Sequence, residues 1–508
     1  MIEYFRLFYL VLSGGLLIWA FTSYLQSRKL PPLPPGPPAD PIIGHLRIMP
    51  TEHHGVAFHE LSKYGKVSHL RALGRTMIIL NSVEAAIDLL DKRGAIYSDR
   101  ITSDVMNLLG WENNMGFFPY GKHLHMHRKM VNDYFNREKC KDYLPLQLSV
   151  AHRLVRRANL EVLISLVDVT LIGVRFSVAI ILRLDYGIEL LSKDDPYLKV
   201  VTDANDCNAR CAPAGGNLVD MFPIMKYLPS WFPGTFPATQ ARSWRHIVDR
   251  MHDLPFEDVK ARIAAGTAKE SFLVTHLDIL DSKDTDYQFT VDDVKGAAGA
   301  ICTAGVDTTS STLMIFMLAM TLYPEVQAEA HAELDRVIGS ERLPDFEDRP
   351  NLPYLECLVQ ESYRWHTAVP IGIPHRATED DIYNGMFIPK GSIVVANTRG
   401  MTLDEDIYQE PRRFDPSRYL RGEPHPVGQF GFGRRICPGR HLADANVWIA
   451  IASILAAFTI SPVKAADGTP IIPEEEFLSG ITRQVGLIRC RGEMLTLPLV
   501  TLSHLSVS

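Results

Sequence analysis

The sequence lacks the paired cysteines from which zinc clusters and disulfide frameworks are built. Its seven cysteines are scattered among 508 residues, and no two of them form a Cys-x-x-Cys pair. An odd number of scattered cysteines argues against a small disulfide scaffold and is typical of a reducing compartment. Cys207 and Cys211 lie four residues apart and would share a helix face, but we do not predict a metal site from this pair alone.

A strong excess of charge is absent as well. The formal net charge is −7, charged residues make up 22% of the chain, and hydrophobic residues make up 46%. This balance excludes a disordered chain and argues against a nucleic-acid scaffold, so no nucleic-acid partner is expected. A length of 508 residues is enough for one large core or for two to three ordinary domains.

Charge is missing in particular from residues 7–25, a run long enough to cross a bilayer as a helix. The alternative is a cleaved signal peptide. Glu3 beside Arg6, together with the absence of a small-residue cleavage site, favours a retained single-pass anchor. Arg28 and Lys29 follow the run, so the positive-inside tendency predicts that the bulk of the chain is cytosolic.

The chain continues as L-P-P-L-P-P-G-P-P, a stiff and extended spacer. An SH3-type ligand is the alternative reading of this run. A second apolar stretch, residues 220–236, gathers aromatics and prolines without helical length. It predicts either partial insertion at the membrane interface or packing beneath a loop. We therefore divide the chain into an anchor over residues 1–29, a proline-rich hinge over 30–38 and one large domain over 39–508.

The chain does contain a glycine-rich stretch around one cysteine. Residues 430–439 read F-G-F-G-R-R-I-C-P-G, and an apolar run over 442–458 follows and predicts a helix. Glycine permits close approach of the backbone to a flat partner, and Pro438 removes a competing N–H donor. The N-terminus of the following helix favours a negative sulfur on Cys437. Such a thiolate can ligate a haem iron; the alternative is a turn around a structural cysteine.

The full pattern resembles the haem-binding signature of the cytochrome P-450 superfamily, with Phe430 seven residues and Arg435 two residues before Cys437. The resemblance implies a mainly α fold with a small β region and a haem b cofactor. It implies that Cys437 is the axial ligand of the haem iron and that Phe430 packs beside its sulfur. Arg435 is expected to bond to a haem propionate, and Gly433 is expected in the loop against the cofactor.

Residues 291–322 are apolar nearly all round, which predicts a buried or a membrane-spanning helix. Asp307 lies in the middle, where a lipid-facing charge is costly, so we predict a buried central helix of about 45 Å. The stretch 304–309, A-G-V-D-T-T, resembles the oxygen-binding signature of the same superfamily. The resemblance implies that Thr308 bonds back to its helix, that Asp307 relays protons and that Gly305 leaves room for a ligand.

A charged pair on a second predicted helix is the next motif. Glu361 and Arg364 lie three residues apart within residues 352–365, and therefore on one helix face. Alone, such a pair is a common surface ion pair. Together with P-R-R-F at residues 411–414 it resembles a buried charged network of the family, in which Arg413 is the third member.

Two further contacts to the cofactor are implied by the resemblance. Arg376, in the run P-I-G-I-P-H-R-A, is expected at the second propionate, because a guanidinium can form two parallel hydrogen bonds to a carboxylate. The alternative is a surface arginine. In the helix predicted over 120–135, the family often carries Trp and Arg where this chain has Leu124 and His125. His125 is expected to replace that arginine at a propionate, and Arg128 is expected at the cofactor as well; the alternative is a solvated basic face.

The small β region is predicted from alternation and turn residues. Residues 67–80 predict a hairpin that turns at Leu73-Gly74, and residues 385–396 predict another. Val369, Ile371 and Ile373 alternate like a strand that faces a pocket. The tail around residues 477–481 resembles the segment that re-enters the pocket in the family. The predicted pocket lining is Val105, Leu108, Ala300, Ala304, Val369, Ile371 and Leu478.

This lining carries no charged anchor, which predicts a lipophilic substrate such as a terpenoid, a polyketide or an aromatic metabolite. The resemblance implies a haem-thiolate monooxygenase in the endoplasmic reticulum membrane that uses O2 and electrons from an NADPH-cytochrome P-450 reductase, with a b-type cytochrome as a further donor. Its predicted basic docking face includes Arg128, Lys129, Arg434 and Arg440. The wording of residues 373–391 is similar to that of fungal microsomal members of secondary metabolism.

Two alternatives stay open at this point. One is a haem-thiolate isomerase or dehydratase that rearranges peroxides without dioxygen. The other is a non-catalytic haem sensor or ligand-binding protein. The Asp307-Thr308 pair counts against the first alternative, because that chemistry needs no proton relay.

Overall fold

The structure is a computed structural model, and the residues it describes are 30–50, 52–162, 169–190, 192, 194–211, 217–282, 289–465, 467–475, 477–478, 480, 482, 484–485 and 490–494. Helices dominate the described part, and the strands form small sheets. The expectation of a mainly α fold with a small β region is confirmed. The anchor predicted over 1–29 lies outside the described residues.

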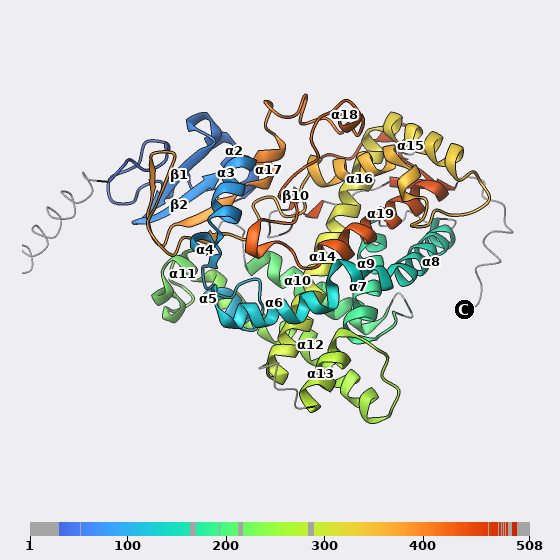
Figure 1. Ribbon diagram of the computed structural model, residues 1–508, viewed down its shortest axis with the longest axis horizontal. Coiled ribbons are helices and arrows are strands. Elements are labelled where there is room, and N and C mark those ends of the chain that lie inside the picture. Colours follow the sequence, from blue (N-terminus) through green and yellow to red (C-terminus); the bar gives the residue numbers. More distant parts are fainter. Residues whose placement is uncertain are drawn as a thin grey trace, which may run out of the picture.

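The helices fill most of Figure 1, with the larger sheet to one side of them. Their bounds are α2 (His54–His59), α3 (Val83–Ala86), α4 (Gly94–Tyr97), α5 (Asp104–Leu109), α6 (Lys122–Phe135), α7 (Arg137–Asp142), α8 (Leu144–Val162), α9 (Val169–Tyr186), α10 (Pro196–Cys211), α11 (Leu218–Met221), α12 (Phe236–Ala264), α13 (Phe272–Asp281), α14 (Val291–Leu322), α15 (Pro324–Val337), α16 (Pro353–Trp365), α17 (Thr398–Thr402), α18 (Ser417–Leu420) and α19 (Arg440–Ala457).

The long helix α14 runs through the middle of the molecule (Figure 1). It begins at a capping box, in which the side chains and backbone N–H groups of Thr290 and Asp293 bond reciprocally. Along its 32 residues it packs against α9, α16 and α19, which supply much of the main apolar core. Among the described residues, α14 is the one helix long and apolar enough to cross a membrane, but 72% of its apolar window is buried. The predicted buried central helix is therefore confirmed.

A glycine on α14 lies against α9. A Cβ on Gly305 would lie 2.6 Å from Cδ1 of Ile181, whereas a Cβ on Gly173 of α9 would make only an ordinary contact of 3.4 Å with the carbonyl oxygen of Ser310. Gly305 therefore serves helix–helix contact with α9. Gly305 is also partly exposed, so the expectation that it leaves room for a ligand stays a prediction.

The strands form four small sheets in the described part of the chain. One has five strands in the order β1-β2-β7-β4-β3, one has three in the order β12-β8-β9, and β5-β6 and β10-β11 are pairs. Their bounds are β1 (Val67–Ala72), β2 (Arg75–Leu80), β3 (Asp99–Arg100), β4 (His375–Arg376), β5 (Asp381–Tyr383), β6 (Met386–Ile388), β7 (Ile393–Ala396), β8 (Phe458–Lys464), β9 (Pro470–Ile471), β10 (Phe477–Leu478), β11 (Gln484–Val485) and β12 (Cys490–Met494).

The first predicted hairpin is confirmed and the second is wrong. β1 and β2 pair around a turn in which Leu73 and Gly74 have φ values of 48° and 84°. β6 pairs with β5, whereas β7 joins the larger sheet between β2 and β4. No strand covers residues 369–373; the extended pair begins only at His375. Alternation over a few residues did not identify the partner strands, because pairing is set by the tertiary structure.

Candidate active site

The loop before α19 is shaped by glycines. Gly428, Gly431 and Gly433 have φ values of 96°, 77° and 53°, in the region that side chains rarely adopt. A Cβ on Gly433 would overlap the carbonyl oxygen of Leu90, so this position also requires glycine for close packing. The N–H of Cys437 donates to the carbonyl of Phe430 at 2.8 Å and closes the loop. The loop thus presents Cys437, which stays partly exposed, at the start of α19.

Basic groups surround the backbone of this cysteine. Nη2 of Arg128 donates to the carbonyl of Ile436 at 2.8 Å, and Nη1 of Arg440 donates to the carbonyl of Cys437 at 3.0 Å. Burial raises the pKa of the Cys437 thiol, while the Gly439 N–H and these two guanidinium groups act in the opposite direction. A bound metal ion would complete the shift toward thiolate, because a coordinating thiol is deprotonated by the ion.

Two buried arginines lie in the same region. Arg435 donates from Nε to the carbonyl of Ser98 at 2.7 Å and from Nη2 to that of Phe118 at 2.6 Å. Arg100 donates from Nη1 to the carbonyl of Ile373, and its buried Nε has no hydrogen-bond partner among the described atoms. Burial, and then repulsion from Arg128, lowers the pKa of Arg435 to about 10. Burial, and then repulsion from Arg435 and Arg128, lowers the pKa of Arg100 as well.

The strand β4 turns His375 inward and Arg376 outward. His375 is buried, and its Nδ1 lies 2.7 Å from the carbonyl oxygen of Tyr97. Arg376 is 41% exposed, and its Nε and Nη2 bond to one carboxylate oxygen of Asp99 at 2.7 and 2.5 Å. The expectation that Arg376 faces the cofactor is not supported. Strand alternation places its neighbour His375 beside the buried cations, since Arg100 and Arg435 both lower the pKa of His375 after burial itself.

On helix α6, too, nearby side chains differ in whether they face the interior or the solvent. His125 is exposed and contacts the ring edge of Tyr120 at 4.9 Å between centroids, whereas Leu124 is buried. Arg128 lies one turn after Leu124 and turns toward the cysteine loop. The structure therefore does not bear out the placement of His125 against the cofactor. The inward direction of Arg128 also removes it from the predicted docking face, of which Lys129 and Arg434 are exposed.

The residues present fit an anionic, flat and thiolate-bound group. We name Arg100, Arg128 and Arg435 the cation cluster, and His375 lies beside it as a neutral ring whose pKa is lowered by burial, Arg100 and Arg435. Its arginines donate to backbone carbonyls, and Asp99, the acid that acts on Arg100 and Arg435, is bonded to Arg376. Buried cations without an anion are costly, so the cluster favours a negatively charged partner such as a pair of propionates.

Helix α14 has an open face in its middle. Ala304 is exposed and Ile301 and Thr308 are partly exposed, although the adjacent Cys302 and Thr303 are buried. Positions 301, 304 and 308 share one side of a helix, so this side borders space that side chains do not fill. Oγ1 of Thr308 donates to the carbonyl of Ala304 at 2.9 Å, as predicted.

The side chain of Asp307 contacts the C-terminal segment. The hydroxyl of Thr482 donates to its Oδ2. The tail lies beside α14 here, since β11 packs on that helix. The position of β11 beside α14 agrees with the prediction that the C-terminal segment returns to the pocket. Leu478 lies in β10, and its side chain is outside the described part of the structure.

The other predicted lining residues divide into two groups. Val105 and Ile371 are fully buried within apolar clusters, so neither lines an open space. Ala300 is buried, and Leu108 and Val369 are partly exposed. Ile371 packs on the larger sheet, with Phe58, Leu70, Met77, Ile79 and Val395. Its assignment to the pocket is therefore wrong, and the reason is that residues 369–373 do not form the expected strand.

The charged network around α16 has a different third member from the one predicted. Nε and Nη2 of Arg364 bond to the two carboxylate oxygens of Glu361 at 2.8 Å each. Nε of Arg418 bonds to Glu361 at 3.1 Å, and the hydroxyl of Tyr419 donates to it at 2.8 Å. Arg413 is 55% exposed and contributes only its carbonyl oxygen, which accepts from Arg364 and Arg418.

A signal for Arg418 was present in the sequence. Pro-x-Arg-aromatic occurs twice, at residues 411–414 and at residues 416–419, five positions apart. Only the second places its arginine inside. Arg100 had no comparable signal, because a single arginine outside any motif is usually exposed. His375 could have been found from strand alternation next to Arg376.

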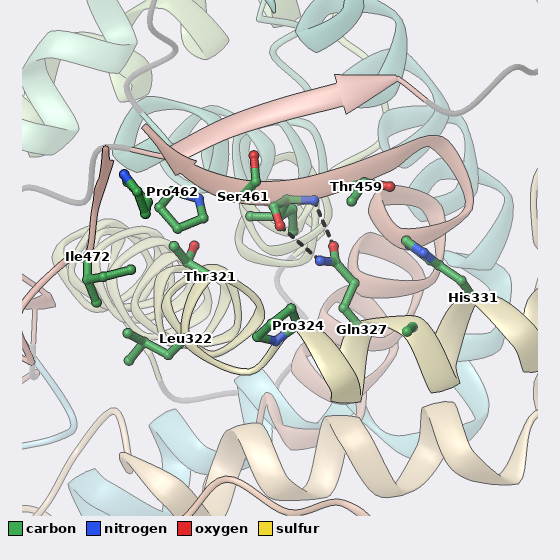
Figure 2. A pocket seen from close by; sticks show the side chains of 12 residues that line it. Thr321, Leu322, Pro324, Gln327, His331, Thr459, Ser461, Pro462 and Ile472 are labelled. Carbon is green, nitrogen blue, oxygen red and sulfur yellow. Dashed lines mark hydrogen bonds between the residues drawn. The ribbon is translucent and has the colours of Figure 1, made fainter. Parts of the chain in front are cut away.

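A cavity of about 510 Å³ lies at the far end of α14 (Figure 2). It is bounded by the end of α14, the start of α15 and the strand β8. In this cavity, Nε2 of Gln327 donates to the carbonyl oxygen of Ile460 at 2.9 Å, and the N–H of Ile460 donates to Oε1 of Gln327 at 2.7 Å. Thr321 in its wall lies 13 residues beyond Thr308, or about 20 Å along the helix. The cavity is therefore separate from the candidate active site.

Comparison with known proteins gives the class. The family model "Cytochrome P450" matches residues 34–485. The solved structure of a zebra fish cytochrome P450 with progesterone superposes with a TM-score of 0.73 at 24% identity, over 87% of this chain and 99% of that one, which shows the shared fold. The chain belongs to the cytochrome P450 family, and the family implies a haem-thiolate cofactor.

Fungal relatives refine this class. The chain is 36% identical to a tryptamine 4-monooxygenase of Psilocybe cyanescens, over 94% of this chain and 95% of the relative. It is 38% identical to a cytochrome P450 monooxygenase of Ampulloclitocybe clavipes, over 95% and 89%. It is 37% identical to one of Armillaria gallica, over 92% and 94%. The protein is a cytochrome P450 monooxygenase whose relatives are fungal enzymes.

Proposed function

We propose that this monooxygenase hydroxylates a lipophilic small molecule, with O2 and with electrons from an NADPH-cytochrome P450 reductase. The observation that carries the proposal is the pairing of a partly exposed Cys437, in a glycine-shaped loop, with the cation cluster beside it. Cysteine sulfur and buried cations are the complementary halves of a site for an iron porphyrin that carries two carboxylates.

The residues that would hold haem b are the sulfur of Cys437, for the iron, and the cation cluster, for the propionates. When bound, the haem supplies the activation of dioxygen at its iron. Arg128 and Arg440 favour the anionic form of the sulfur, and the N–H of Gly439 acts in the same direction. Gly433 keeps the loop pressed onto Leu90, so the sulfur is held in place by the backbone.

Thr308 and Asp307 position protons in this proposal. The hydroxyl proton of Thr308 is committed to the carbonyl of Ala304, so Oγ1 is left as an acceptor for a water on the open face of α14. Asp307 holds the hydroxyl of Thr482 at Oδ2 and can exchange protons with water that reaches the same side. Both groups lie where α14 is least buried.

An apolar open face supports a lipophilic substrate. Ala304 and Val369 carry no polar side-chain atom, and no charged side chain occurs among the lining residues described above. We propose a terpenoid, a polyketide or an aromatic metabolite, hydroxylated at carbon. One fungal relative is a tryptamine 4-monooxygenase, so aromatic amines belong in the first set of test substrates.

The proposed setting is the endoplasmic reticulum membrane, with residues 1–29 as anchor, 30–38 as hinge and 39–508 as the catalytic domain facing the cytosol. Support comes from the segment between α11 and α12. Tyr227 and Trp231 are 74% and 79% exposed there, Ile224 is exposed as well, and so is Phe236, the first residue of α12. Several exposed aromatic and aliphatic side chains within one short stretch are typical of a surface that rests on lipid.

The test is expression with a fungal reductase in microsomes, followed by screening of lipophilic metabolites for a mass gain of one oxygen. Turnover that needs NADPH and O2 supports the proposal, whereas turnover without them would indicate an isomerase or dehydratase. Thr308→Ala should keep its haem and lose most product formation. A protein that binds haem but converts no substrate in any form would instead indicate a sensor.

A further inference from the structure

Two histidines and an aspartate meet at the junction of α6 and α14. His123 and His127 are four residues apart on α6, so they share a helix face, and Asp293 lies in the first turn of α14. Their Nε2 atoms lie 2.7 and 3.0 Å from the same carboxylate oxygen, Oδ1 of Asp293. This group, which we call the His-Asp cluster, has no place in the chemistry proposed above.

The aspartate of the cluster is fixed by its other oxygen. Oδ2 accepts from the N–H and the hydroxyl of Thr290, at 2.8 and 2.7 Å. Because these bonds form the capping box of α14, the carboxylate cannot rotate without loss of the cap. Oδ1 is therefore held toward α6 by the backbone of a long helix.

The two imidazoles are held as firmly. The ring of Phe118 stacks on His123, with centroids 4.3 Å apart and an angle of 23° between the planes, and meets His127 edge-on at 4.8 Å. The side chain of His127 is fully buried, whereas that of His123 is 51% exposed. The cluster thus has a closed inner side and an open mouth, through which an ion and a water molecule can enter.

The spacing suits a tetrahedral transition-metal ion. The three ligand atoms lie within 4.8 Å of one another. Bonds of about 2.0–2.1 Å to zinc place tetrahedral ligands about 3.3–3.4 Å apart. Separations of 2.7 and 3.0 Å between nitrogen and oxygen are about 0.3–0.7 Å shorter than this. The larger difference is at His123, whose exposed ring can move outward to make room. Two imidazoles and one carboxylate form a ligand set typical of Zn²⁺.

We propose that Nε2 of His123, Nε2 of His127 and Oδ1 of Asp293 bind a single divalent transition-metal ion of the zinc class, with water as the fourth ligand. The ion joins α6 to the first turn of α14. Since Arg128 follows His127 directly, the same ion steadies the helix that carries a member of the cation cluster. The ion stabilises the fold and takes no part in the proposed oxidation.

The test uses the full chain with its haem, solubilised in detergent, stripped with a chelator and dialysed against Zn²⁺. We expect about one tightly held Zn²⁺ per chain, measured by plasma mass spectrometry, and nitrogen and oxygen ligands in X-ray absorption at the zinc edge. His123→Gln should weaken binding by about tenfold or more. His125→Gln, at an exposed position two residues away, is the matched control and should bind as the parent does.

Thermal unfolding gives a second readout, because an ion that binds the native state raises the midpoint. Zn²⁺ should raise it in the parent and in His125→Gln, but not in His123→Gln. Equal Zn²⁺ binding by both variants, or no stoichiometric binding by the parent, would overturn the proposal and leave the cluster a hydrogen-bonded tie between helices. Haem content and turnover do not enter this test, so it stands or falls separately from the proposed function.

Discussion

Two buried groups of charged residues in this protein differ in completeness. Around α16, Glu361 bonds to Arg364 and Arg418, and Arg418 also bonds to Glu423 at 2.7 Å. Acidic and basic groups balance there, and they sit within a closed set of hydrogen bonds. The cation cluster beside Cys437 contains arginines that donate to carbonyls, and no carboxylate bonds to them among the described residues.

The difference indicates which group serves the fold and which one serves a ligand. In the Glu361 network, ion pairs and hydrogen bonds within the network offset the desolvation cost of burying the charges. The network therefore needs no ligand to be stable in the folded chain. A cluster of one sign is complete only when an anion arrives. The two groups should therefore respond in opposite ways when a member is removed.

The largest effect is expected for Glu361→Ala. The variant leaves Arg364 and Arg418 buried without their carboxylate, which costs ~3–5 kcal/mol of stability. We expect little folded protein and loss of haem incorporation, measured by the yield of the thiolate-type carbon monoxide spectrum. Arg413→Ala is the control, because that side chain is exposed; a loss as large as that of Glu361→Ala would show that Arg413 has a buried role after all.

Removal of a cation from the other group should have the reverse sign for the haem-free protein. Arg100→Met deletes a buried guanidinium whose Nε has no hydrogen-bond partner in the described structure. We expect the denaturant midpoint of the haem-free chain to be unchanged, or its stability to be raised by up to about 3 kcal/mol. Haem transfer to an acceptor globin should become faster. A midpoint that drops as in Glu361→Ala would remove the distinction between the two groups.

A smaller effect is expected from pH. The pKa of His375 is lowered well below its usual value by burial and then by Arg100, so the folded haem-free protein keeps this ring neutral where the unfolded chain takes up a proton. Stability is then full above pH about 6.5 and falls below it by up to about 1.4 kcal/mol per pH unit. The slope should be weaker in His375→Gln, measured by denaturant unfolding at several pH values. An equal slope in both proteins would assign it to other groups.

The smallest effect is expected at His125. Because it is exposed on the outer side of α6, His125→Ala should change stability by no more than about 0.5 kcal/mol and leave haem content intact. Arg128→Ala, three residues further on, should lower haem retention markedly, since it removes a cation and the bond to Ile436. Reversed results for the two variants would restore the expectation drawn from the sequence.

The sequence was informative where the signal is local. The bounds of α14 follow from its apolar composition, the β1-β2 hairpin from its turn residues, and the cysteine loop from glycines whose positive φ values the structure bears out. Each of these features depends on residues close together in the chain.

Sequence reasoning failed where the question was which of two nearby basic residues faces inward. His375 lies inside instead of Arg376, and Arg418 instead of Arg413, so in these two cases the type of chemistry was predicted and the residue was not. On α6 the sequence predicts both His125 and Arg128 at the cofactor, and only Arg128 faces inward. The direction of a side chain depends on which face of the element is covered, and that covering comes from segments distant in sequence: α6 packs on the loop before α19, and β4 lies between β3 and β7.

The bond between the hydroxyl of Thr482 and Asp307 has a consequence for the length of the chain. The carboxylate on the central helix meets a residue 175 positions further along the chain, well beyond the cysteine loop. A product that stopped shortly after the cysteine loop would contain every signature motif and still leave this carboxylate without its tail partner. Completion of the C-terminal segment is therefore as much a condition for an intact centre as the motifs themselves.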